Sequence, residues 1–231
     1  MRGVGLAVSC PRCGGEVRAP DLMYSDWRCD HCGSISPLYV PGIIGADVIT
    51  GVRDRLRAAA TDDGPLPLWC PWPLPPGWTV TGVGWVADNR RGVRATALAL
   101  GGPAPFSTGP ADLVLVAEDL GVGLGNGLGG IVGSDPGAGW RECVDRTAPH
   151  AKVRVSGHPT PLWAVESVDR SVYIGEARAL WLYAIAWPAP AGYLLADEIE
   201  LHDLVESQPS ELVFGAPSRR LRPDNGSLSR S

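Results

Sequence analysis

Hydrophobic and polar residues alternate in short segments over much of the chain, which is the pattern of β-strands. Between residues 78 and 206, turn-forming residues separate these segments from one another. The predicted strands cover residues 79–86, 93–100, 113–117, 152–155, 161–165, 171–174, 180–186 and 199–204. Residues 180–187 are apolar on both faces, so they predict a central, buried strand. A turn is predicted at residues 88–92 and a short helix near residues 194–200.

One segment has the spacing of a helix. Ile49, Val52 and Leu56 recur every three or four residues, with charged residues mostly on the opposite face, which predicts an amphipathic helix over residues 46–60. Asp47 is a candidate cap, and the polar residues 61–64 end the helix. We expect the helix to pack on the neighbouring domain, and a partner-binding helix is the alternative.

Proline and tryptophan are concentrated in residues 64–78. The six prolines of this stretch favour an extended backbone. Trp69, Trp72 and Trp78 are interleaved with them, and a freely moving linker would expose too much apolar surface if it carried three tryptophans. We therefore expect a stiff strap that lies against the C-terminal domain. A proline-rich ligand for an aromatic groove on a partner is the alternative.

Four cysteines form two closely spaced pairs. Two residues separate Cys10 from Cys13 and Cys29 from Cys32, and fifteen residues lie between the pairs, a spacing typical of zinc sites. Two intervening residues let a tight turn aim both sulfurs at one ion. Four thiolates leave no open coordination position, so we predict a structural Zn²⁺ ion. Two disulfides or incidental cysteines are the alternative, and His31 could replace one ligand.

Residues 16–28, between the pairs, can form a hairpin in which Val17, Met23, Tyr24 and Trp27 shield the site. The first pair reads C-P-x-C-G and the second W-x-C-x-x-C-G, so residues 6–40 resemble the zinc-ribbon superfamily. That resemblance implies a metal and a local fold. It implies no activity, because zinc ribbons occur in transcription factors, ribosomal proteins, enzyme subunits and adaptors.

Composition and charge narrow the functional classes. The chain has 231 residues, of which 45% are hydrophobic, so it can bury a substantial core. Its net charge of −5 is unsuited to general binding of nucleic acids or anionic membranes. Residues 1–40 carry four arginines against four acidic residues, which leaves no basic stripe. The longest strongly apolar run, residues 179–187, is too short to cross a bilayer. Reduced thiols and the lack of a signal-peptide core predict a cytoplasmic protein.

A glycine cluster occupies residues 121–133, and Gly125, Gly127 and Gly130 form G-x-G-x-x-G within it. A dinucleotide loop requires this pattern to open a helix within a βαβ unit, which the surrounding sequence does not predict. We expect a glycine-rich loop or bulged strand against which Trp140, a strap tryptophan or another backbone packs closely. The alternative is an enzyme that binds a phosphorylated or acyl ligand at these three glycines.

The whole chain resembles an uncharacterised, typically actinobacterial family with a zinc ribbon, a Pro/Trp strap, a glycine cluster and the C-terminal segments P-L-W (residues 161–163) and V-Y-I-G-E-A (residues 172–177). Some members of that family carry a phosphotransacetylase label. Here the arginines are scattered along the chain and no helix-opening phosphate loop is evident. The resemblance therefore implies an architecture and no established activity.

The predicted fold is α+β and β-rich: a zinc ribbon (1–40), a helix and Pro/Trp-rich linker (41–77), a mainly antiparallel β domain (78–215) and a disordered tail (216–231). Cys70 and Cys143 have no partner at ligand spacing and are expected to be free and buried. No catalytic residue is assigned. The preferred hypothesis is a zinc-stabilised binding or adaptor protein with a protein partner. A small-molecule ligand and a nucleic-acid-associated zinc ribbon are the alternatives.

Overall fold

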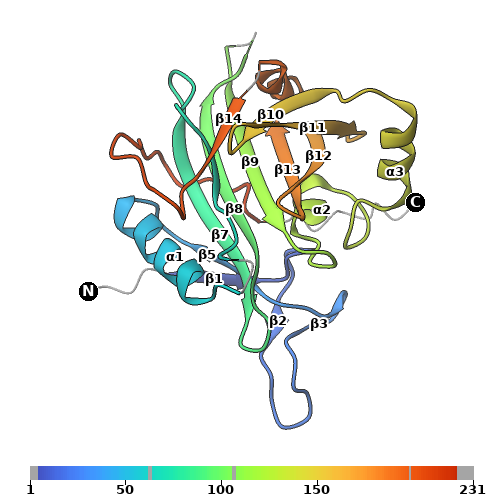
Figure 1. Ribbon diagram of the computed structural model, residues 1–231. Coiled ribbons are helices and arrows are strands. Elements are labelled where there is room, and N and C mark those ends of the chain that lie inside the picture. Colours follow the sequence, from blue (N-terminus) through green and yellow to red (C-terminus); the bar gives the residue numbers. More distant parts are fainter. Residues whose placement is uncertain (1–4, 62–63, 106–107, 198, 223–231) are drawn as a thin grey trace.

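Figure 1 shows a computed structural model of the chain, in which residues 5–61, 64–105, 108–197 and 199–222 are described. Most of the regular structure is β-strand, with a few short helices. The predicted α+β, β-rich fold class is confirmed. Within the described residues, no helix has the length and apolar character needed to cross a membrane.

Eleven strands form one large sheet, in which every pair is antiparallel except β10 with β14. In order across the sheet, the strands are β1 (Leu6–Ser9), β5 (Leu38–Pro41), β7 (Thr79–Asp88), β8 (Gly92–Pro103), β9 (Pro110–Glu118), β13 (Leu180–Trp187), β12 (Ser171–Ala177), β11 (His158–Val165), β10 (Ala151–Val155), β14 (Ile199–Asp203) and β6 (Trp69–Pro71). Each strand predicted from the alternation is present, and β13 is central and buried as expected.

The remaining elements are small. A second sheet joins β2 (Val17–Arg18), β3 (Arg28–Cys29) and β4 (Gly33–Ser34). The helices are α1 (Ala46–Ala58), α2 (Leu124–Gly129) and α3 (Gly137–Arg146), together with the 3₁₀ helix η1 (Ala189–Ala196). In Figure 1 the hairpin of β2 and β3 projects from the body, while α1 and α2 lie on different sides of the large sheet.

Both faces of the large sheet are buried. Successive residues of its strands point to opposite faces and pack in two different hydrophobic cores. In β9, Leu113 and Leu115 pack in one core, which also contains Ile49 of α1. Val114 and Val116 pack in the other core, with α2. The predicted apolar face of α1, with Val52 and Leu56, is therefore the face that docks on the sheet.

The Pro/Trp strap lies against the β-rich domain, as predicted. Its residues Trp69, Cys70 and Trp78 are buried, and β6 extends the sheet by pairing with β14. The Thr96 hydroxyl of β8 donates to the Pro67 carbonyl of the strap. The edge strand β6 also contacts β8 and β9 in the middle of the same sheet. The large sheet is therefore strongly curled, with β6 lying over its central strands.

Three local predictions need correction. Gly45 is the N-cap of α1 and no side chain caps it, since Asp47 already lies within the first turn. The helix expected near residues 194–200 lies earlier in the chain, where residues 189–196 form η1, and strand β14 begins at Ile199. The expected disorder does not hold for residues 216–222: the Ser218 amide donates to the Thr81 carbonyl at 2.9 Å, and Leu221 is buried over Gly82. Residues 223–231 lie outside the described part of the chain.

Candidate metal centre

The fold brings all four predicted cysteine ligands to one point. Cys10 and Cys13 follow β1, whereas Cys29 ends β3 and Cys32 directly precedes β4. The four Sγ atoms lie within 4.8 Å of one another, and the Sγ atoms of Cys13 and Cys29 are 3.5 Å apart. All four residues are free thiols, so the disulfide alternative fails. His31 is not part of this group. We call residues 10–36 the cysteine module.

The conformation of the two turns explains why both sulfurs of each cysteine pair point toward the centre of the cluster. The Gly14 amide donates to the Cys10 carbonyl at 2.9 Å, and the Cys10 amide donates to the Gly15 carbonyl at the same distance. Gly14 and Gly33, each directly after the second cysteine of its pair, have φ values of +68° and +76°. Only glycine adopts this left-handed region at little cost, so the sequence C-x-x-C-G specifies the turn. We call each such turn, with its two cysteines, a knuckle; residues 10–15 form the first one.

The thiols are held in a partly desolvated environment. Burial raises the pKa of Cys10 well above its usual range, although the backbone amides of Arg12 and Cys13 act in the opposite direction. Burial also raises the pKa of Cys32 to about 11. At Cys29 burial is outweighed by hydrogen bonds from the amides of Cys32 and His31, which lower the pKa to about 7. Thiolates at this site therefore require a cation to balance their charge.

The sulfur cluster fits a tetrahedral metal ion. A Zn–S distance of about 2.3 Å places tetrahedral sulfurs roughly 3.8 Å apart, which agrees with sulfurs that all lie within 4.8 Å of one another. Val17, Trp27 and Ile35 pack against the cysteines, as expected for the first two. Met23 and Tyr24 do not shield the site: their exposed fractions are 83% and 51%, because they lie in the turn beyond the short strands.

The first cysteine knuckle docks directly on the glycine cluster. The Arg12 guanidinium donates to the carbonyls of Gly121 and Val122 at 2.7 and 3.1 Å. A Cβ atom added to Gly127 would lie 2.5 Å from the Pro11 carbonyl oxygen. Glycine is thus required at residue 127 because the backbone of the knuckle occupies the space of a side chain.

The glycine cluster differs in part from the prediction. Its centre is the short helix α2 rather than a loop or a bulged strand. The expected close packing is present, but the partners are the knuckle backbone at Gly127 and the Tyr183 ring at Gly125. Trp140 instead donates to the Ile174 carbonyl. Gly130 lines a cavity of about 380 Å³ that is shared with Cys13 and Cys32.

A buried carboxylate occupies the start of α2, and the sequence did not point to it. Glu118 is fully buried, and its Oε2 accepts hydrogen bonds from the amides of Leu124 and Gly125 at 2.7 and 3.2 Å. Burial raises its pKa to about 8. The Tyr183 hydroxyl donates to Asn126 Oδ1 at 2.9 Å beside it. The amides that a phosphate would need are therefore engaged by the protein itself. The only sequence signal was an acidic residue that ends an apolar strand.

The remaining cysteines lie apart from this site. Cys70 is buried, as expected, but Cys143 is only half-buried, with its Sγ 3.4 Å from the Thr147 hydroxyl. His150, seven residues further along the chain, accepts a hydrogen bond from the Ala164 amide at its Nδ1. Cys143 and His150 therefore each have a structural partner of their own.

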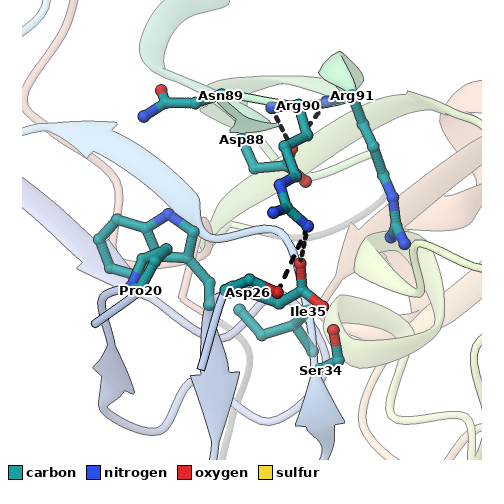
Figure 2. Close-up of a pocket in the computed structure, with 10 residues that line it drawn as sticks. Pro20, Asp26, Ser34, Ile35, Asp88, Asn89, Arg90 and Arg91 are labelled. Carbon is teal, nitrogen blue, oxygen red and sulfur yellow. Dashed lines mark hydrogen bonds and ion pairs between the residues drawn. The ribbon is translucent and has the colours of Figure 1, made fainter. Parts of the chain in front are cut away.

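A polar cavity separates the cysteine module from the β7–β8 turn. Figure 2 shows this cavity, which has a volume of about 410 Å³. Arg90 reaches across it to the Asp26 carboxylate at 3.2 Å, whereas Arg91 extends to one side of that pair. Asp88 Oδ1 accepts hydrogen bonds from the amides of Arg90 and Arg91, which holds the turn in place.

Comparison with known proteins identifies a matching family. The model of a family described as a family of unknown function (DUF6758) matches residues 2–221. No curated protein matches the chain, and no solved structure does.

Replacing Gly127 with Ala should destabilise the protein by about 1–3 kcal/mol, because the added methyl group collides with the knuckle backbone. Urea unfolding measures the change. Gly51→Ala is the matched control, since Gly51 lies on the exposed side of α1, no atom lies within 4 Å of the position that its Cβ atom would take, and alanine favours a helix. Equal effects of the two substitutions would show that the knuckle does not pack on α2.

Glu118→Gln should change how stability depends on pH. The folded protein raises the pKa of Glu118 from 4.5 to about 8, so the folded state holds this proton more tightly than the unfolded state does. The wild type should therefore lose up to about 1.4 kcal/mol per pH unit between roughly pH 5 and 8 relative to the variant. Urea unfolding at several pH values tests this, and parallel pH profiles would contradict it.

Proposed function

The chain belongs to this family of unknown function, DUF6758, and we propose that it is a non-catalytic binding protein whose four-cysteine site holds a structural zinc ion. The main observation behind the proposal is that the four-cysteine cluster and the β2–β3 hairpin form one unit. Four thiols gather at the base of the β2–β3 hairpin, and the tip of that hairpin is ordered, apolar and exposed.

The donor set supports zinc in a structural role. Four thiolates favour Zn²⁺ over hard cations and complete a tetrahedron, so no position remains for a substrate or a reactive water. The hydrophobic cluster of the cysteine module is small: the buried residues Cys10, Cys29 and Ile35 form it, and four partly buried residues pack against them. Without a metal, so small a core would not hold the hairpin. Metal-binding thiols must stay reduced, which supports a cytoplasmic location.

The hairpin tip has the properties of a protein-binding element. Leu22 is completely exposed, and Met23 and Tyr24 follow it with exposed fractions of 83% and 51%. The turn is nevertheless ordered, because Asp21 Oδ1 accepts hydrogen bonds from the amides of Met23 and Tyr24 at 2.8 and 2.9 Å. Arg28 lies over the Tyr24 ring at 4.4 Å. An ordered apolar tip loses little entropy when it enters a pocket.

Charge around the tip favours a protein partner over a membrane or a nucleic acid. Asp21 and Asp26 flank the three apolar residues, and they would be repelled by anionic lipid and by phosphate backbones. Arg18 and Arg28 only balance the acidic residues of the hairpin. A partner protein with an apolar pocket is the surface that suits this tip.

Metal analysis tests the zinc proposal. The protein purified without added metal should contain about one zinc ion per chain, and Cys32→Ser should lose it. Chelation should remove the NMR signals of the folded hairpin before those of the large sheet. Cys143→Ser, at another half-buried free thiol, is the control and should keep the zinc. A metal-free wild type with an intact hairpin would contradict the proposal.

The triple substitution Leu22→Ser, Met23→Ser and Tyr24→Ser tests the tip. A photo-crosslinker at residue 20 should capture a defined partner in cells, and the triple variant should reduce the yield about tenfold or more. Folding stability should change by less than about 0.5 kcal/mol, because all three side chains are exposed.

The matched control carries Val132→Ser and Val168→Ser, which replace two single valines that are as exposed as Leu22. It should leave the yield of the crosslinked partner unchanged. Equal yields from the wild type and the triple variant would exclude the tip as the contact, whatever the metal content.

A further inference from the structure

Three arginines from separate segments line one narrow cleft between the cysteine module and the large sheet. Arg12 comes from the first knuckle, Arg91 from the β7–β8 turn and Arg94 from β8. The other lining residues are Ser34, Ile35, Ser36, Gly121 and Val122. Among the residues that the structure describes, no acidic side chain lines the cleft, whose volume is about 20 Å³.

Each guanidinium has donors left over after its contacts with the protein. Arg12 uses Nε and Nη2 on two carbonyls. Arg94 uses Nε on the Asp119 carboxylate at 3.3 Å and Nη2 on the Leu120 carbonyl at 2.7 Å. In the part of the chain that the structure describes, neither Nη1 atom has a hydrogen-bond partner, and the Arg91 guanidinium has none at all.

The nearby carboxylates do not balance the three positive charges. Asp119 pairs with Arg94. The Asp88 carboxylate interacts electrostatically with Arg91 and offsets part of its charge, but the Asp88 oxygens are occupied: Oδ2 accepts the Ser36 hydroxyl and Oδ1 accepts the amides of Arg90 and Arg91. Two carboxylates therefore face three guanidinium groups. Arg12 contacts carbonyls, which carry only partial charge. Three like charges around one cleft repel one another, and an anion between them would remove that repulsion.

We propose that this cleft binds an oxyanion of the phosphate class, either free or as a phosphomonoester. Guanidinium groups present planar pairs of N–H donors that match phosphate oxygens, and three of them can approach a tetrahedral anion from different sides. The cleft has room for roughly one water-sized atom, such as one oxygen of the anion, but not for an organic molecule.

An organic group has a place beside the cleft. The cavity of about 410 Å³ in Figure 2 shares Ser34, Ile35 and Arg91 with the cleft, and Trp27 forms part of its wall. An anion held here would also join the cysteine module, through Arg12, to the body of the protein, through Arg91 and Arg94. This inference does not depend on the partner-binding role of the hairpin tip.

Isothermal titration of the full-length, zinc-loaded protein with inorganic phosphate, at constant ionic strength, tests the proposal. Binding should be saturable, and phosphate should raise the unfolding temperature whereas chloride should not. Arg91→Ala should weaken binding about tenfold or more, since Arg91 has no other hydrogen-bond partner for its guanidinium in the described residues. Arg18→Ala is the control, because this exposed arginine of the cysteine module pairs with Asp30 and lines neither the cleft nor the larger cavity, and it should leave phosphate affinity within about twofold.

A second titration with phenyl phosphate distinguishes the two sources of the anion. Tighter binding of the ester than of inorganic phosphate identifies a phosphomonoester site that extends into the larger cavity, whereas equal affinity identifies a site for the free ion. Two results would overturn the proposal: no saturable binding of either compound, or equal losses in Arg18→Ala and Arg91→Ala. Circular dichroism establishes that both variants remain folded.

Discussion

The contact between the first cysteine knuckle and α2 is the constraint on which the rest of the molecule depends. Carbonyl groups of Pro11 and Arg12 occupy the space that a side chain at residue 127 would need, and the Arg12 guanidinium binds the carbonyls of the preceding loop. So close an approach of two backbones requires a glycine on one side and a rigid turn on the other. A metal ion held by four cysteines would supply that rigidity, and the β2–β3 hairpin extends from the same turn.

Glu118 accounts for the part of the glycine cluster that resembles a phosphate loop. A helix start with free amides attracts an acidic ligand, and here the carboxyl group of the fully buried Glu118 takes that place. The glycines therefore permit close packing of Tyr183 and the knuckle around the buried Glu118 side chain. Two features that look unrelated in the sequence, the cysteine pairs and the glycine cluster, belong to one structural unit.

The same docking creates the surfaces to which we assign function. It directs the apolar tip at Leu22 to Tyr24 away from the body, and it places Arg12 beside Arg91 and Arg94. The tip offers apolar contacts and the cleft offers charged hydrogen bonds, so the two surfaces suit different ligands. Both depend on the position of the cysteine module relative to the sheet.

The sequence by itself determined the features whose physics is local. Alternation of apolar residues identified the strands, because side chains of a strand point to opposite faces in turn. The spacing C-x-x-C-G identified the knuckles, because a thiol-bearing turn is built from five consecutive residues. Only the tertiary structure decided the role of Glu118, the pairing of β6 with β14, the burial of Leu221 and the meeting of Arg12, Arg91 and Arg94. Each of these four features joins segments that are far apart in the sequence. The order of the strands and the docking of the knuckle bring those segments together, and residues nearby in the chain determine neither the strand order nor the docking.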